Sequence, residues 1–317
     1  MALDFEKPLE EIENRISELK KLNEKADVSF DTEISALERK LRSTSKRVYS
    51  KLSPWETVQI ARHAERPLLR DYIAGLCTEF LELHGDRCFG DDQGIIGGFA
   101  TLRQHRVMVI GHQKGRSVEE KIEANFGMAS PDGYRKAMRL MHLAAKYKLP
   151  IVSFIDTPGA YPGLEAEARG QAEAIARNLT EMSLLPVPVI VVVTGEGGSG
   201  GAIGIGVGNV VLMLSNAVYS VISPEGCASI LWRDGSKAPE AAAALKITAD
   251  SLAEQGIIDE IIPEPEGGAH RDPNAAIEST GDAIVKHLRR LKKMSAKRLI
   301  DHRYDKFSKI GRFKSRK

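Results

Sequence analysis

The sequence predicts an α/β protein built on a parallel sheet, with helices packed outside it. Two apolar runs, 150–156 (PIVSFID) and 187–193 (VPVIVVV), have the length and β-branched composition of strands buried on both faces. A helix is expected between them at 165–182, where acidic and basic side chains alternate along one face. Each run ends in a loop of small residues. Because α/β proteins place ligand sites at the carboxyl ends of strands, these loops form the candidate site.

Composition indicates the class of protein. The chain has 317 residues, of which 42% are hydrophobic and 28% charged, as in an ordinary globular protein. No run of about 18 apolar residues occurs, so we expect no membrane-spanning helix, and the acidic, amphipathic N-terminus is unlike a signal peptide. The three cysteines are widely spaced without a CxxC pair. We therefore expect a reducing cytoplasm, no disulfide framework and no metal site built by this chain alone.

Residues 1–52 predict a helical hairpin that serves assembly. Apolar residues recur at three- and four-residue spacing in two segments, which a polar link at 23–31 separates. Each segment carries one narrow apolar stripe, as in a coiled coil, and the two stripes can cover each other or a partner. The stripes consist of Leu9, Ile12, Ile16 and Leu19 in the first segment and Ile34, Leu37 and Leu41 in the second.

The remaining chain divides into a core at 53–285 and a basic helical tail at 286–317. The patterns predict helices over 53–83, 132–148, 165–182 and 238–256 and from 276 onward, and strands over 98–102, 106–111, 150–156, 187–193, 210–214, 217–222 and 257–263. The tail carries 14 Lys and Arg against two Asp. A solvated basic helix explains this excess, and binding to a nucleic acid or another acidic partner is the alternative.

Three known patterns fit the glycine-rich stretch 195–201 (GEGGSGG), which follows the second buried run. Gly195, Gly197 and Gly200 match the dinucleotide fingerprint G-x-G-x-x-G. Gly197, Ser199 and Gly201 match the nucleophile elbow G-x-S-x-G of serine hydrolases. In the third interpretation, the backbone N–H groups of Gly200 and Gly201 bind an oxyanion without any side chain.

The rest of the sequence favours the oxyanion interpretation. A dinucleotide fingerprint needs a substantial helix after the loop and an acid on the next strand, whereas here glycines recur at 204, 206 and 208 and the next acid is Glu225. A hydrolase would combine Ser199 with Asp234 or Asp259 and His270, but that order arises easily by chance in a chain of this length. The oxyanion interpretation requires only two glycine amides at the start of a helix, and the sequence contains them. In a dry pocket such amides stabilise a developing negative charge.

Five longer motifs occur along the chain: GHQKG at 111–115, NFGM at 125–128, DTPGAYPG at 156–163, GEGGSGG at 195–201 and YSVISPEGCASILW at 219–232. Their order and spacing closely resemble the carboxyltransferase alpha subunits of bacterial acetyl-CoA carboxylases. The match covers nearly the whole chain, including the N-terminal hairpin and the PEPEGGAHR loop at 263–271. The resemblance implies a crotonase-type fold, a spiral of ββα units with helices packed outside.

The resemblance also implies an activity and partners. A carboxyl group would pass from carboxybiotin, held by a biotin carboxyl carrier protein, to acetyl-CoA, giving malonyl-CoA in the first committed step of fatty acid synthesis. The chain would act only with a beta subunit, in an α2β2 assembly, with biotin carboxylase in the larger complex. Zinc would be bound by the beta subunit and not by this chain. A stand-alone crotonase-type acyl-CoA hydratase or hydrolase is the alternative.

By the same resemblance, the N–H groups of Gly200 and Gly201 form the oxyanion hole for the biotin oxygen. Further substrate contacts are expected from small or charged residues at strand ends: Gly159, Ala160, Tyr161, Glu225, Gly226, Lys114 and Arg116. The first three would wall the biotin side, and the two basic side chains would attract a carboxylate or a CoA phosphate. For each of them a structural or solvated role is the alternative, and His112 is expected to be structural.

Overall fold

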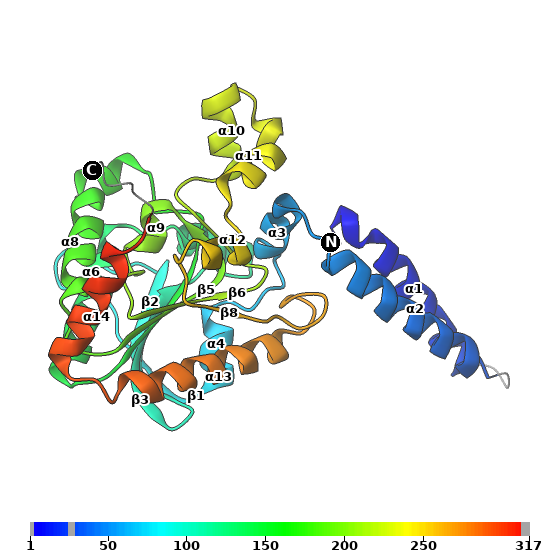
Figure 1. Cartoon of the computed structure of the whole chain (residues 1–317), viewed down its shortest axis with the longest axis horizontal. Helices are drawn as coiled ribbons and strands as arrows, with labels where there is room; N and C mark the ends of the chain where they lie inside the picture. Colours follow the sequence, from blue (N-terminus) through cyan, green and yellow to red (C-terminus); the bar gives the residue numbers. More distant parts are fainter. Residues whose placement is uncertain (1–2, 25–28, 312–317) are drawn as a thin grey trace, which may run out of the picture.

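The computed structural model describes residues 3–24 and 29–311, which form a sheet-centred core and a helical hairpin that extends away from it (Figure 1). The hairpin consists of α1 (Lys7–Asn23) and α2 (Asp31–Tyr49), preceded by the short 3₁₀ turn η1 (Asp4–Glu6). Residues of both predicted stripes are buried together between the helices. The two helices pack along these stripes, and residues 25–28 of the link between them lie outside the described residues.

One mixed sheet lies at the centre of the core, and within the described residues it has eight strands. Their order is β1-β2-β3-β4-β5-β6-β8, and β7 pairs separately with β5. The pairs β1–β2 and β2–β3 are antiparallel, whereas every pair from β3 onward is parallel. The strands are β1 (Cys77–Glu82), β2 (Ile95–Leu102), β3 (His105–His112), β4 (Ile151–Thr157), β5 (Val189–Gly198), β6 (Val210–Leu214), β7 (Val218–Ser220) and β8 (Glu260–Ile262).

Helices cover both faces of this sheet, because its central strands are apolar on both sides. Helix α6 packs against β2 and β3, and α13 packs against α4, β5, β6 and β8. The helices of the core are α3 (Pro54–Ala61), α4 (Leu69–Leu76), α5 (Val118–Glu123), α6 (Pro131–Lys146), α7 (Leu164–Ala168), α8 (Gln171–Ser183), α9 (Ser199–Ile203), α10 (Pro224–Trp232), α11 (Ala238–Leu245), α12 (Ala249–Glu254), α13 (Pro273–Leu291) and α14 (Ala296–Ser308), with short 3₁₀ turns η2 (Asn125–Gly127) and η3 (Gly235–Lys237).

The structure corrects several of the predicted elements. Residues 77–82 form the edge strand β1 and not the end of a helix, because they pair with β2 along its outer side. The helix predicted over 165–182 breaks into α7 and α8 at Gly170, whose φ of 83° is left-handed. The segment after Ser223 is the helix α10 and not a turn, with the Ser223 hydroxyl accepting the N–H of Gly226 as its cap.

The C-terminal helices are anchored by a buried arginine. Helix α13 runs without a break through residue 286, so the predicted start of the tail falls inside one helix. On α14, the guanidinium of Arg303 donates to the carbonyl oxygens of Leu185 and Val187 and to the Asn209 side-chain oxygen. These acceptors lie just before β5 and β6, so α14 is fixed at the amino ends of these two strands. None of the helices in the described ranges has the length and apolar composition that crossing a bilayer requires.

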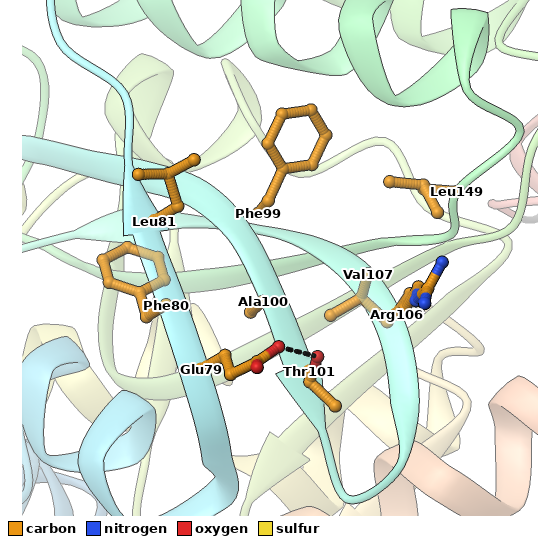
Figure 2. A pocket seen from close by; sticks show the side chains of 9 residues that line it. All are labelled: Glu79, Phe80, Leu81, Phe99, Ala100, Thr101, Arg106, Val107 and Leu149. Carbon is orange, nitrogen blue, oxygen red and sulfur yellow. Dashed lines mark hydrogen bonds between the residues drawn. The ribbon is translucent and has the colours of Figure 1, made fainter.

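An open groove lies on the outer face of the sheet near its β1 edge, and Figure 2 shows its lining. Its lining includes the apolar residues Phe80, Leu81, Phe99 and Val107, of which Leu81 is 62% exposed. Its lining includes neither the glycine-rich stretch nor the 156–163 turn. The groove is therefore separate from the site that the sequence predicts.

Candidate active site

The glycine-rich stretch forms a sharp corner between a strand and a helix. Strand β5 continues through Gly198, and helix α9 begins directly at Ser199. The sequence predicted a strand that ends at residue 193, followed by a glycine loop, whereas β5 continues through residues 194–198. Ser199, at the corner, has a φ of 51°, a left-handed conformation that costs a non-glycine residue about 1–2 kcal/mol. Such strain, held by the surrounding fold, is common at functional sites.

Two glycines at this corner let the 156–163 turn approach the backbone. A Cβ at Gly198 would overlap the carbonyl oxygen of Pro158, and a Cβ at Gly201 would overlap the backbone of Gly159 and Ala160. Glycine is therefore required at both positions. The structure brings together two motifs that lie about 40 residues apart in the sequence, and among the predicted site residues it places Gly159 and Ala160 against Gly201.

The first turn of α9 presents backbone amides without acceptors from its own helix. The first four N–H groups of any helix lack intrahelical partners, and those of Gly200 and Gly201 belong to this set. Among the described residues, no side chain caps this helix. A Cβ at Gly200 would meet only Ile175 Cδ1, at 3.5 Å, and one at Gly159 would meet nothing within 4 Å. Open space therefore lies beside Gly159, and Gly200 is not crowded by its neighbours.

A network of ion pairs lies behind the corner. The Lys114 ammonium is 2.7 Å from Asp156 Oδ1 and 3.0 Å from Glu196 Oε2, and Arg62 Nε is 2.6 Å from Glu196 Oε1. Arg62 also pairs with Glu225 at the start of α10. Burial raises the pKa of Glu196, but Lys114 and Arg62 outweigh it and hold that pKa below its usual value. The network thus joins α3, β4, β5 and α10 through charged groups.

Sequence analysis missed three members of this network: Arg62, Asp156 and Glu196. Two signals were present in the sequence. Glu196 is a single acid among glycines, and Asp156 ends an otherwise apolar strand. An isolated charge in such surroundings must find a partner, because an unpaired buried charge is very costly. Arg62 carried no comparable signal, since it follows an ordinary amphipathic helix.

His112 lies behind the corner and is almost completely buried, with neither ring nitrogen within hydrogen-bonding geometry of a partner among the described residues. Burial and the neighbouring Lys114 lower its pKa to about 3. The imidazole is therefore neutral at ordinary pH, which agrees with the predicted structural role and argues against a role as general base.

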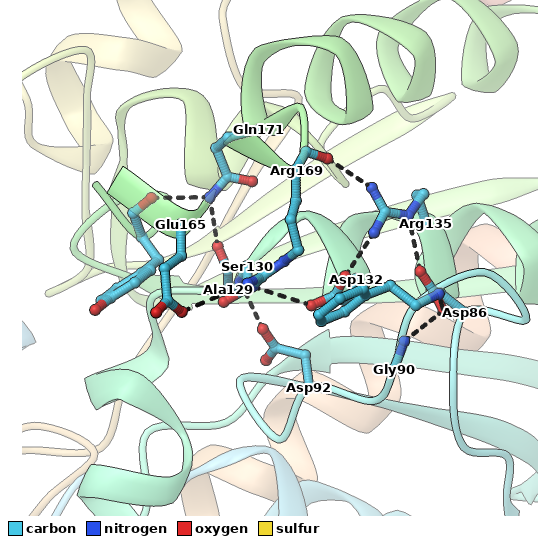
Figure 3. A network of polar contacts seen from close by, with 12 residues as sticks. Asp86, Gly90, Asp92, Ala129, Ser130, Asp132, Arg135, Glu165, Arg169 and Gln171 are labelled. Atoms are coloured by element: carbon cyan, nitrogen blue, oxygen red, sulfur yellow. Dashed lines mark hydrogen bonds and ion pairs between the residues drawn. The ribbon is translucent and has the colours of Figure 1, made fainter. Parts of the chain in front are cut away.

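A second polar network fixes the 159–163 turn against the start of α6 (Figure 3). Gln171 Nε2 donates to the carbonyl oxygens of Ala129, at 2.9 Å, and Tyr161, at 3.0 Å. The N–H of Tyr161 donates to the same Ala129 oxygen at 3.0 Å. Arg169 reaches Asp132 on α6, at 3.3 Å. The turn that touches Gly201 is thus held at Tyr161 to the segment before α6.

The structure separates the residues that a hydrolase triad would need. His270 pairs with Glu6 at the base of the hairpin, and Asp234 caps the turn η3. Asp259 accepts the N–H of Val211 and pairs with a lysine of α14. Ser199 is exposed, and none of these three residues contacts it in the structure. The nucleophile-elbow interpretation therefore has no acid and base to support it.

Two further predicted residues lie at the edge of this region. The Arg116 guanidinium pairs with Asp71 and donates to the carbonyl oxygen of Ala64, so it faces α4 and the segment before it. Gly226 lies in the first turn of α10, where its N–H is bound by the Ser223 cap. Glu225 joins the site only through Arg62.

A cluster of possible metal ligands lies at the junction of hairpin and core. Atoms of Glu6, His63 and His270 lie within 4.8 Å of one another. The Glu6 carboxylate already accepts hydrogen bonds from Tyr49, His270 and Arg271. The Arg271 guanidinium, 3.2 Å from this carboxylate, opposes a metal cation there. The arrangement is that of a polar contact between the hairpin and the core.

Comparisons with known proteins agree with the resemblance. A family model described as acetyl co-enzyme A carboxylase carboxyltransferase-like matches residues 2–311. The acetyl-coenzyme A carboxylase carboxyl transferase subunit alpha of Geobacter metallireducens is 54% identical over 316 residues, 98% of each chain. The subunit of the same name from Anoxybacillus flavithermus is 56% identical over 311 residues, 98% of this chain and 96% of that protein.

Solved structures show the same fold. A transcarboxylase 12S structure superposes with a TM-score of 0.57 at 19% identity and covers 83% of this chain and 46% of that one. The beta subunit of geranyl-CoA carboxylase from P. aeruginosa gives 0.56 at 14% identity, over 77% of this chain and 46% of that one. The chain thus spans less than half the length of these structures. The predicted crotonase-type α/β fold is confirmed.

Proposed function

The chain belongs to the family of acetyl-CoA carboxylase carboxyltransferase alpha subunits, and on this premise we propose that it transfers a carboxyl group from carboxybiotin to acetyl-CoA, giving malonyl-CoA. The observation that carries this proposal is the strained corner at Ser199. There, the amides of Gly200 and Gly201 lie in the first turn of α9, where they have no acceptor within the helix, and Gly201 contacts the 156–163 turn. Such preorganised donors suit a reaction in which negative charge develops on an oxygen.

In this proposal, bound carboxybiotin supplies the carboxyl group, and the chain's own residues hold the site. The N–H groups of Gly200 and Gly201 donate to the ureido oxygen as it gains negative charge. Backbone amides suit this task because they carry no charge to desolvate and need no adjusted pKa. Gly159, Ala160 and Tyr161 wall the biotin side, and the network behind them keeps the wall fixed.

We assign the other predicted contacts a peripheral role. Glu225 and Gly226 begin α10, close to the corner, and would border the site. Arg116 is paired with Asp71, but its side chain is 43% exposed, and in the proposal it meets a CoA phosphate at the rim. Lys114 does not share this role, because its ammonium is paired with Asp156 and Glu196 inside the protein.

The exposed face of α10 supports the need for a partner chain. Val221, Ile230 and Leu231 are 77%, 72% and 61% exposed on a helical arm that projects from the core in Figure 1. Apolar side chains gathered in this way mark an interaction surface. In the proposal, the beta subunit of an α2β2 assembly covers this arm and supplies the acetyl-CoA half of the site and the zinc, while a biotin carboxyl carrier protein delivers the substrate from biotin carboxylase.

A stand-alone hydratase or hydrolase is not favoured. Such enzymes need an acid or base at the reacting atoms. The imidazole nearest the corner, His112, is buried and neutral, and the predicted triad residues lie apart.

Reconstitution tests the proposal. The purified chain should give no malonyl-CoA from acetyl-CoA and carboxybiotin, and addition of a beta subunit should restore turnover. Activity of the isolated chain, or none after a stable complex has formed, would contradict it. A hydratase assay with crotonyl-CoA on both samples serves as the control for the alternative function.

A further inference from the structure

Two carboxylates stand directly behind the proposed oxyanion site. Asp156 ends β4, three residues before Gly159, and Glu196 lies in the glycine-rich part of β5. They are linked directly, because Asp156 Oδ1 accepts the backbone N–H of Glu196 at 2.9 Å. Both residues are buried, with 6% and 9% exposure. Left unneutralised, their charges would oppose any negative charge that develops at the corner.

Lys114 is placed to neutralise both. Its ammonium lies between the two carboxylates, and its side chain is only 19% exposed. Gly127 covers it so closely that a Cβ there would overlap Lys114 Cγ. Burial alone would lower the pKa of Lys114. The charges of Asp156 and Glu196 have the larger combined effect, so that the pKa of Lys114 lies above its usual value. The side chain therefore stays charged and fixed.

We propose that Lys114 is a positioning residue that neutralises Asp156 and Glu196 and holds the 156–163 turn and the β5 corner in fixed relative positions. The amides of Gly200 and Gly201 then lie where they can donate to a developing oxyanion. This inference rests on the proposed carboxyltransferase function. It replaces the direct contact between Lys114 and a substrate anion that the sequence suggested, because two carboxylates already occupy the ammonium.

Arg62 extends the same arrangement toward the partner-facing arm. Its guanidinium bridges Glu196 of β5 and Glu225 of α10. Burial alone would lower the pKa of Arg62, but the two carboxylates have the larger combined effect and raise this pKa above its usual value. The three acidic side chains thus meet two basic ones, so that the network retains one net negative charge shared among its carboxylates.

The test uses the assembled complex and compares Lys114→Met with wild type at saturating substrates. With the ammonium gone, we expect kcat for carboxyl transfer to fall roughly 10- to 100-fold, while KM for acetyl-CoA stays within about twofold. The double variant Lys114→Met/Glu196→Gln removes one opposing charge together with the ammonium. We expect it to regain at least about fivefold in kcat over Lys114→Met.

Lys306→Met is the matched control. Lys306 is also a largely buried lysine paired with one carboxylate, that of Asp259, but it lies on α14. We expect it to lower the melting temperature without changing kcat. The melting temperature of each variant, measured by circular dichroism, shows that the assays were run on folded protein.

Any other kinetic result would contradict either the positioning role of Lys114 or the proposed function. A raised KM with unchanged kcat in Lys114→Met would show a direct substrate contact and overturn the positioning role. Unchanged kinetics, or a loss of kcat that Glu196→Gln does not relieve, would overturn it as well. An inactive wild-type complex would overturn the proposed function and the inference together, whereas active wild type with an unaffected variant overturns the inference alone.

Discussion

The contact between Gly201 and the 156–163 turn predicts that a single methyl group disables the site. In Gly201→Ala, the new Cβ would lie 2.6 Å from Ala160 N and 2.8 Å from Gly159 O, whereas ordinary contacts begin near 3.4 Å. These neighbours are backbone atoms, so they cannot rotate away. Because the new Cβ would also lie 2.4 Å from Gly159 C, the turn or the corner must move by up to roughly 1 Å, and misplacement near 1 Å costs about 100-fold in rate.

We therefore expect kcat of Gly201→Ala to fall about 100-fold, which corresponds to about 2.7 kcal/mol in the activation free energy. Overpacking should also destabilise the fold by about 1–3 kcal/mol. Gly200→Ala is the comparison within the same helix. Its Cβ would lie 3.5 Å from Ile175 Cδ1, an ordinary contact, and its N–H is retained. We expect it to lower kcat less than about fivefold.

The assay is steady-state carboxyl transfer by the complex with the beta subunit at 25 °C, with folding checked by circular dichroism. Equal losses in the two variants would show that a methyl group anywhere in the first turn of α9 blocks the ligand. Wild-type kcat in Gly201→Ala would refute the proposal that the turn positions the corner.

Four further outcomes are expected. Ser199→Gly should keep carboxyl transfer and raise the free energy of unfolding by about 1 kcal/mol, because a φ of 51° suits glycine; loss of turnover would revive the nucleophile interpretation. Burial alone would raise the pKa of Glu6. The hydrogen bonds that its carboxylate accepts have the larger combined effect, and they hold this pKa well below its usual value. The stability that this carboxylate adds is therefore complete above its unfolded pKa and is lost as the pH falls toward its folded pKa, so between about pH 5.5 and pH 3 the melting temperature of wild type should fall more steeply than that of Glu6→Gln. Arg303→Ala should cost about 2–4 kcal/mol in urea unfolding, since it leaves buried carbonyl groups unpaired, and KM should not change. Leu231→Glu should abolish co-elution with the beta subunit in gel filtration, whereas Leu184→Glu, at an equally exposed leucine (60% against 61%), should not; co-elution of both variants would show that α10 is not the interface.

Much of the fold followed from local patterns. The apolar runs at β4 and β5 are strands because β-branched residues buried on both faces suit a parallel sheet, and the structure has both. The hairpin followed from two apolar stripes at helical spacing. Edge elements were harder to predict. Strand β1 has the sequence of an amphipathic helix end, and only its pairing with β2 makes it a strand.

The candidate site, like the fold, was predictable from the sequence only in part. Gly200, Gly201 and the 156–163 turn were predictable because glycine density and strand ends are visible in the sequence. Their mutual contact was not, since it depends on the parallel pairing of β4 with β5, which places the two strand ends side by side. The partners of Lys114 were hidden for the same reason.

The amino-acid sequence by itself thus determined the family, the type of each central element and the two amides proposed to bind the oxyanion. These depend on residue type and local conformation. Only the tertiary structure decided that Ser199 lacks a triad, that Lys114 faces inward between Asp156 and Glu196, and that Gly201 must remain glycine. The physical reason is that burial, ion pairing and close approach join residues distant in the sequence, and no local pattern records which of them meet.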